Sequence, residues 1–288
     1  MSSTSPTASA SETMADTTSD MVAGALSPAQ RELADRARAF LEETLVPLEL
    51  EAEAAGGRLA AETVAEIKRA AIAARLHGGR MPVELGGQGW SMVERFLVNE
   101  QLGRCTNGLH WHVPDVYNVW AAATAEQQRR WVIPALRGEG GDAYAVTEAD
   151  AGSDPSGIST AAVASGAGAW RINGEKWFVT SGDVARVLIV VANVIDGPDR
   201  LPTLFLVEPS APGVQFVDDP RYTHNYPHGH PTIRFTDVEV DSGAVIGAVG
   251  GGDELQRRWF TEERIGIAAH GLGAMWRLLD DKTSWALK

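Results

Sequence analysis

A run of small residues flanked by acids, within the stretch 144–154 (YAVTEADAGSD), is the first part of the sequence whose residue types suggest ligand binding. Its first residues alternate as a short strand would, and the remainder has the composition of a loop. The tripeptide Ala-Gly-Ser at 151–153 leaves its backbone N–H groups almost uncovered, so an anionic ligand can lie against the main chain. Asp150 and Asp154 flank this turn and disfavour a bare phosphate. The stretch therefore favours a larger ligand that carries a polar ring at one end and a phosphate at the other.

A second stretch, 172–182 (INGEKWFVTSG), joins an aromatic pair to a hydroxyl. Asn-Gly at 173–174 is a strong two-residue hairpin signal, so we expect the aromatic residues to begin the return strand. Side chains alternate on a strand, which puts Phe178 and Thr180 on one face. An aromatic ring beside a hydroxyl makes a stacking surface with a hydrogen-bonding group, as a flat heteroaromatic cofactor needs. The same pattern also fits a core strand whose threonine is satisfied internally, and this segment alone leaves both interpretations open.

Together the two stretches resemble the flavin-binding middle domain of the acyl-CoA dehydrogenase family. The family's T-E-P-x-A-G-S-D motif appears as Thr147–Asp154, with Ala149 in place of the usual proline. Its N-G-x-K-x-[FW]-[IV]-T-x-G motif appears as Asn173–Gly182, and Glu262–Ala269 resembles the opening of the family's C-terminal helical domain. The resemblance runs over about 27–279. It implies an FAD-dependent oxidoreductase that converts an acyl-CoA thioester into the 2,3-enoyl-CoA.

The resemblance also implies which residues bind the cofactor. By their positions in the two motifs these are Tyr144, Val146, Thr147, Gly152, Ser153, Phe178, Val179 and Thr180. Phe178 is expected to pack on the isoalloxazine ring, with Thr180 near flavin N5. Gly152 and Ser153 are expected at the pyrophosphate, and Ser153 also at the thioester end of the substrate. Family members are oligomers and pass their electrons to a separate acceptor.

The catalytic base is expected at Glu263. Most members of the family use a glutamate that lies beyond the last residue of this chain, and a minority use one at the position that matches Glu263. Its neighbour Arg264 matches part of the substrate-binding wall in relatives. Without the resemblance, Glu262 and Glu263 are only an acidic pair at a helix start, where carboxylates favour the helix dipole. Two other functions therefore stay open: a non-catalytic or truncated subunit that borrows its base from a partner, and a flavin oxidase or monooxygenase on the same scaffold.

The composition is that of an ordinary soluble globular protein. Of the 288 residues, 44% are hydrophobic and 22% are charged. No apolar run approaches the ~18 residues of a membrane helix. The net charge of −13 argues against nucleic acid or an anionic membrane surface as a partner. A single cysteine, Cys105, excludes an internal disulfide and a cysteine-rich metal site, and it favours the cytoplasm. Residues 1–26 contain no basic residue and no apolar core, so we expect a disordered tail without a targeting signal.

The hydrophobic pattern divides the chain into three parts. Residues 27–139 show helical patterns and are expected to form an N-terminal helical bundle. Three capping-box patterns begin helices there, at Ser27, Ser91 and Thr124. Across 140–249 short apolar runs with Gly and Pro turns favour an antiparallel β-barrel or sandwich that binds the flavin. The helical pattern returns in 250–288 as the start of a C-terminal helical domain, so the expected fold class is α+β.

Five histidines raise the question of a metal site: His110, His112, His224, His228 and His230. The first two fall where we expect helix, which separates their rings, and the other three lie in a loop. Fewer than three convergent ligands with a carboxylate do not make a zinc site, so no metal is expected.

Overall fold

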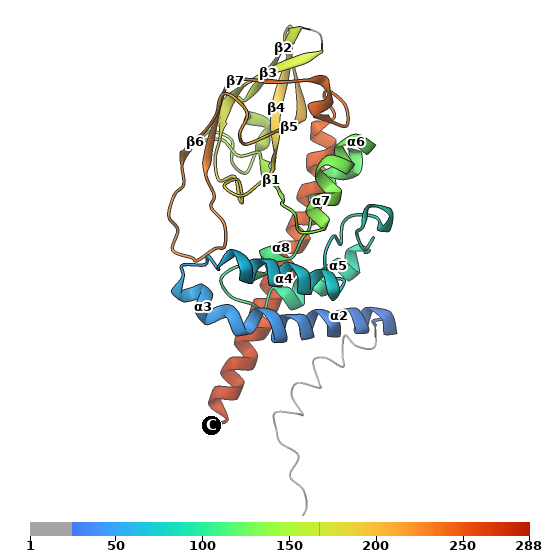
Figure 1. The fold of residues 1–288 in the computed structure, drawn as a ribbon, viewed down its shortest axis with the longest axis vertical. Helices are drawn as coiled ribbons and strands as arrows, with labels where there is room; N and C mark the ends of the chain where they lie inside the picture. The colour runs from blue at the N-terminus through green and yellow to red at the C-terminus, as the bar shows by residue number, and fades with distance from the viewer. Residues whose placement is uncertain (1–24, 167) are drawn as a thin grey trace, which may run out of the picture.

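The computed structural model describes residues 25–166 and 168–288, so most of the tail expected at 1–26 lies outside the described residues. Most of the helices form one layer and the strands another, and a long C-terminal helix runs along both (Figure 1). The chain thus has the α+β architecture that its sequence predicts.

The helical layer is built from the first half of the chain. Its α-helices are α2 (Pro28–Phe40), α3 (Glu49–Ala54), α4 (Ala61–Ala73) and α5 (Met92–Leu102). The short helices α6 (Ala125–Gln127) and α7 (Ile133–Leu136) follow in the chain and lie beside the sheet (Figure 1). All three predicted capping boxes are present at the starts of α2, α5 and α6. In each box a Ser or Thr oxygen accepts the amide three residues on, and that residue's side chain accepts the amide of the cap. Because both amides would otherwise lack partners, these helices begin where the sequence predicts.

The strands form one open sheet, which corrects the prediction of a barrel or sandwich. They are β1 (Asp142–Ala145), β2 (Ala161–Gly166), β3 (Ala169–Lys176), β4 (Val187–Asp196), β5 (Asp199–Val207), β6 (Val214–Asp218), β7 (Thr232–Val240) and β8 (Val245–Ile246). The order is β6-β7-β3-β2-β4-β5-β8, and β1 pairs with β4. Among the described residues β6 and β8 do not pair with each other, and this leaves the sheet unclosed.

The sheet is also mixed, because β4 has two parallel neighbours along one edge. Its first half pairs with β1, with Asp142 opposite Val187, and its second half pairs with β2, with Ala161 opposite Asn193. The other neighbouring pairs are antiparallel. Short spacing between apolar runs does not reveal that β4 is long enough to accept two partners in succession, and for this reason the purely antiparallel prediction is wrong.

The Asn-Gly pair at 173–174 is not a hairpin turn. It lies inside β3, where the pairing with β7 shifts register between Ile172 and Gly174. Gly174 has a φ of +152°, and a Cβ there would lie 2.3 Å from the Thr160 hydroxyl oxygen. The glycine therefore serves a bulge and a close backbone approach.

The aromatic pair 177–178 lies outside any strand, which corrects the expectation that it begins a return strand. β3 ends at Lys176, and Phe178 and Ser181 have φ values of +53° and +63°. Strand alternation therefore does not place the side chains of 177–181.

β4 is buried on both faces along the continuous apolar run that begins it. Val187 and Ile189 join a core with the helices beside the sheet, where Trp120 is fully buried. Leu188 and Val190 join a second core on the opposite face of the sheet. A third core lies among α2, α4 and α5.

The last helix, α8 (Gly252–Ala286), ties the two layers together. It packs along α5 and also contacts β5. Its backbone comes so close to α5 that a Cβ on Gly273 would lie 2.0 Å from the Glu100 carbonyl oxygen. The final turns run on past α2 (Figure 1). None of the helices in the described ranges is both long enough and apolar enough to cross a membrane.

Candidate active site at the junction of the two layers

The two motif stretches lie side by side and are bonded to each other. The Trp177 amide donates to the Thr147 carbonyl over 2.8 Å. The Lys176 ammonium donates to the Val146 carbonyl over 2.9 Å and to the Glu148 carboxylate over 2.8 Å. These bonds join residues 146–148 to residues 176–177, and the side chains of Glu148 and Lys176 are both buried.

The Glu148 carboxylate is enclosed by hydrogen-bond donors. It accepts the Ser159 amide at 2.7 Å, the Ser159 hydroxyl at 2.6 Å and the Thr160 amide at 2.9 Å, in addition to Lys176. Burial by itself would raise the pKa of Glu148, but Lys176 and these hydrogen bonds bring that pKa down to about 2. Glu148 and Lys176 each stand inside one of the motifs, but the resemblance gives no role to either side chain.

Some of the predicted cofactor residues are exposed, and others are buried. Gly152, Ser153 and Phe178 are exposed, Thr147 and Thr180 are partly buried, and Tyr144, Val146 and Val179 are buried. Phe178 is 50% exposed, which leaves an aromatic surface on which a flat ring can stack. A Cβ on Gly152 would meet nothing within 4 Å, so a diphosphate can approach this turn. The exposed residues therefore fit a flavin dinucleotide.

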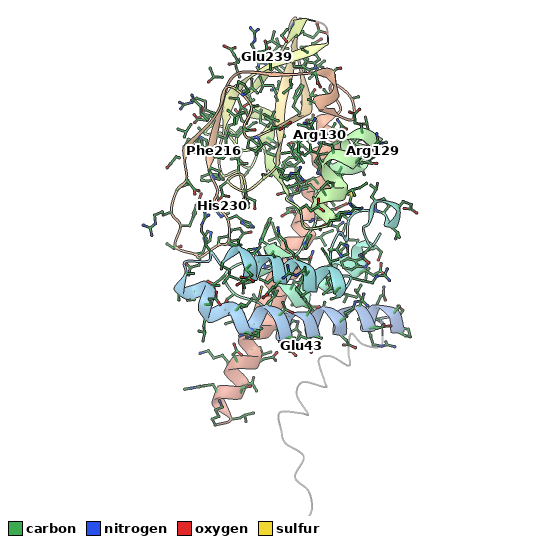
Figure 2. All side chains as sticks on the ribbon, viewed as in Figure 1. Glu43, Arg129, Arg130, Phe216, His230 and Glu239 are labelled. Carbon is green, nitrogen blue, oxygen red and sulfur yellow. The ribbon has the colours of Figure 1, made fainter. Side chains whose placement is uncertain are left out.

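The Thr180 hydroxyl has a protein partner. Its oxygen lies 3.0 Å from Nδ1 of His230, where the sheet layer meets the helical layer (Figure 2). The other ring nitrogen of His230, Nε2, is buried and has no partner among the residues that the structure describes. An unpaired buried nitrogen beside Thr180 marks a polar position at the predicted ring site. In the described ranges, no three His, Cys, Asp or Glu side chains come together in a way that could hold a metal ion.

Tyr144 is packed into an aromatic cluster. Its ring stacks on Trp259 of α8 at 4.4 Å and 18°, and it meets Tyr117 edge-on at 5.4 Å. Its hydroxyl is buried without a partner in the described part of the chain. Tyr144 therefore connects β1 to α8, and its contact with a flavin stays a prediction.

A cavity of about 1060 Å³ lies between the two layers. Its walls come from α4, α5 and α8 and from the segments 110–117, 138–142, 181–185 and 227–228. None of the eight predicted cofactor residues lines it. Two neighbours of those residues do, Ser181 beside Thr180 and Tyr117 beside Tyr144, so the cavity meets the motif surface at these points.

Glu263 lies in the cavity wall beside an arginine. The Arg80 guanidinium is 3.8 Å from the Glu263 carboxylate and 2.9 Å from that of Asp115. Burial raises the pKa of Glu263 above its ordinary value, and the Arg80 charge offsets part of that rise. A carboxylate with a raised pKa in a cavity can act as a general base. Arg80 has no signal in the sequence as a site residue, because only the folded chain brings residue 80 to α8.

Arg264 does not share this environment. It is exposed, does not line the cavity, and lies over the ring of Phe260 at 5.6 Å. Its predicted place in the substrate-binding wall stays a prediction.

Two family models match the chain in succession. The acyl-CoA dehydrogenase N-terminal domain matches residues 27–139, and the acyl-CoA dehydrogenase middle domain matches residues 143–238. The chain belongs to the acyl-CoA dehydrogenase family. The resemblance carried by the two motifs is thereby confirmed.

Curated acyl-CoA dehydrogenases are similar to this chain but longer. A probable medium-chain specific acyl-CoA dehydrogenase 2 of Caenorhabditis briggsae is 30% identical over 272 residues, which cover 91% of this chain and 65% of that protein. A short-chain specific acyl-CoA dehydrogenase of Megasphaera elsdenii is 26% identical over 208 residues, covering 70% of this chain and 54% of that protein. The chain thus spans between about half and two thirds of the length of these relatives.

Solved acyl-CoA dehydrogenase structures share the fold. A probable acyl-CoA dehydrogenase of Mycobacterium abscessus matches with a TM-score of 0.80 and 26% identity, covering 91% of this chain and 70% of that one. An acyl-CoA dehydrogenase of Bacillus anthracis in complex with FAD matches with a TM-score of 0.74 and 22% identity, covering 86% of this chain and 43% of that one. FAD is the cofactor of the family, as the motifs predict.

Proposed function

We propose that this chain is an FAD-dependent oxidoreductase that converts an acyl-CoA thioester into the 2,3-enoyl-CoA. The observation that carries the proposal is the hydrogen bond between Trp177 and Thr147, since it joins both cofactor motifs in one surface. Phe178 would stack on the flavin ring, Thr180 would hydrogen-bond to it, and the backbone of 152–153 would hold the diphosphate. When bound, FAD supplies the acceptor for the β-hydride.

Glu263 is the proposed base. The α-proton of a thioester is weakly acidic, so the base must be positioned and its pKa adjusted to the task. Burial raises the pKa of Glu263, and Arg80, held by Asp115, favours the ionised carboxylate that can accept the proton. Arg264, exposed on the next position of α8, would meet only parts of the thioester outside the cavity.

The proposal is tested with flavin-loaded protein and octanoyl-CoA under anaerobic conditions. The flavin absorbance near about 450 nm should fall in the wild type. Glu263→Gln should keep its FAD and lose absorbance roughly 100- to 10,000-fold more slowly, since a base contributes about that much. Glu254→Gln is the matched control, because Glu254 lies on the same helix and is exposed in a pair with Arg258. Purified protein that neither holds nor acquires flavin would contradict the proposal.

A second candidate is a subunit that takes its base from a partner polypeptide. Apolar side chains on the last turns of α8 favour it, because Met275, Leu278 and Trp285 are 61%, 63% and 75% exposed. A row of this kind is a surface that a partner can cover. In that case the lone chain would bind FAD, and wild type and Glu263→Gln would be equally inactive until the partner is added.

The same proposal includes a separate electron acceptor, assembly into an oligomer and a cytoplasmic location. Comparing dye reduction with oxygen consumption separates a dehydrogenase from a flavin oxidase or monooxygenase on this scaffold. Dye reduction without oxygen consumption is the result expected for a dehydrogenase.

A further inference from the structure

Lys68 differs from the other cations in the cavity wall. The three arginines there are each paired with an acid: Arg58 with Asp183 at 3.1 Å, Arg80 with Asp115 at 2.9 Å, and Arg95 with Glu262 at 2.5 Å. The Lys68 ammonium donates to the Gly138 carbonyl at 3.2 Å, and no described carboxylate forms an ion pair with it. Burial lowers the pKa of Lys68, and no neighbouring acid offsets that effect. Within the described ranges, Lys68 is therefore a partly desolvated charge without a counter-ion.

Two imidazoles stand in the same part of the wall. The rings of His112 and His228 are 5.4 Å apart, edge to face, and both residues line the cavity. His112 is 3% exposed, and neither of its ring nitrogens has a partner within the described ranges. Helix α4, which carries Lys68, contacts the segment Leu109–His112, and all three residues line the same cavity. Burial lowers the pKa of both imidazoles. Asp183, which faces His228, is already engaged by Arg58.

We propose that Lys68, His112 and His228 form a subsite for an anionic oxygen group of the ligand that fills the cavity. An ammonium without a counter-ion is unfavourable in a desolvated wall, and a ligand carboxylate or phosphate is the partner that removes this penalty. The His228 imidazole can add an N–H donor to the same oxygens, and the buried His112 ring supports it edge to face. A cavity of about 1060 Å³ leaves room for such a group beyond an acyl chain, since it is at the upper end of the usual size of small-molecule sites.

The identity of the ligand rests on the proposed function. If the ligand is an acyl-CoA, the anion is either a carboxylate at the far end of the acyl chain or a phosphate of the coenzyme. Both sources share the chemistry that Lys68 would recognise, and matched ligands distinguish them.

The test measures binding of three thioesters to the FAD-loaded protein by calorimetry. Octanedioyl-CoA differs from octanoyl-CoA by one terminal carboxylate, and octanoyl-3′-dephospho-CoA differs from it by one phosphate. In the wild type, we expect one of two affinity differences: octanedioyl-CoA binds more tightly than octanoyl-CoA, or octanoyl-CoA binds more tightly than its 3′-dephospho form. The difference should be roughly tenfold to a hundredfold, the usual range for a charge-assisted hydrogen bond. Lys68→Met should abolish that preference, and Lys68→Arg should keep it.

Lys282→Met is the matched control, because it removes the same charge from an exposed position of α8. His228→Phe is a second variant in case Lys68→Met does not fold, and it should weaken the same preference. If Lys68→Met loses the preference for the terminal carboxylate, the subsite binds the acyl chain. If Lys68→Met loses the preference for the 3′-phosphate, the subsite binds the coenzyme. The inference is overturned if neither preference depends on Lys68 more than on Lys282.

A further measurement separates this inference from the proposed function. Octanoate should raise the unfolding temperature of the wild type more than neutral octanamide does, and this difference should vanish in Lys68→Met. If both results are obtained while no CoA ester binds, the subsite is supported and the proposed acyl-CoA function is rejected. If CoA esters reduce the flavin but no ligand preference depends on Lys68, the function stands and the subsite is rejected.

Discussion

Glu148 and Lys176 connect the two motif stretches at the scale of single side chains. Lys176 bonds to the Val146 carbonyl, and Glu148 accepts amides from 159–160, so one ion pair positions three backbone segments. The functional groups of both side chains are used within the protein. We therefore interpret them as residues that position the cofactor surface without touching the cofactor.

Glu148→Gln should destabilise the protein by about 3–5 kcal/mol, because it leaves the buried Lys176 charge without a counter-ion. Urea unfolding at pH 7 measures this change. Glu239→Gln breaks a pair with Arg171 on the exposed side of the sheet and should change stability by less than about 1 kcal/mol. A Glu148→Gln protein as stable as Glu239→Gln would show that the pair does not hold the stretches together.

At the scale of elements, the packing of α8 on α5 depends on glycines. A Cβ on Gly103 of the α5 C-terminus would lie 2.4 Å from the His270 Cα, and one on Gly273 would lie 2.0 Å from the Glu100 carbonyl oxygen. Both obstacles are backbone atoms, which cannot move without shifting a helix. The close approach keeps Glu263 and His270 of α8 in the cavity wall.

Gly273→Ala should therefore lower stability by about 1–3 kcal/mol through overpacking between the two helices. Gly271→Ala is the control on the same helix, since a Cβ there meets nothing within 4 Å. That change should be neutral or stabilise by up to about 1 kcal/mol, because alanine favours helix. Thermal unfolding of the two variants gives the comparison, and equal effects would contradict the packing argument.

Local and non-local signals differ in how well they predict elements. The three capping boxes involve residues three apart in the chain, so the sequence contains both partners and the helix starts are correct. The Asn-Gly pair at 173–174 is equally local, but β7 pairs across it and turns it into a bulge. A turn signal is therefore outweighed where a strand from elsewhere in the chain supplies the hydrogen bonds.

At the scale of the whole molecule, folding encloses several histidines around the cavity. His110, His112, His228 and His270 all line it. Burial lowers the pKa of each of them, to about 4 for His112 and for His270. Asp142 opposes this trend, since burial raises its pKa to about 6.

The free energy of unfolding should fall between pH 7 and pH 5. In that window the unfolded chain protonates histidines at their ordinary pKa while the folded chain does not, so stability is complete above that pKa and is lost as the pH drops. His112 and His270 should each remove roughly 2 kcal/mol by pH 5, and Asp142 should return roughly 1 kcal/mol by taking up its proton in the folded state.

Urea unfolding at the two pH values measures the difference. His270→Asn should reduce the difference in unfolding free energy between pH 7 and pH 5 by roughly 2 kcal/mol. His224→Asn, at an exposed ring, should leave it unchanged. A wild-type protein equally stable at pH 7 and pH 5 would contradict the burial of these imidazoles.

The sequence by itself determined the family, the three capped helix starts and the residue types at the flavin motifs, because these depend on neighbours a few positions apart. Only the tertiary structure decided that the sheet is open, that Glu148 meets Lys176, and that Lys68, His112 and His228 share one wall. These features join residues from 28 to 160 positions apart, and no local pattern records such pairings. They depend on which surfaces exclude water together once the helical and sheet layers pack on α8.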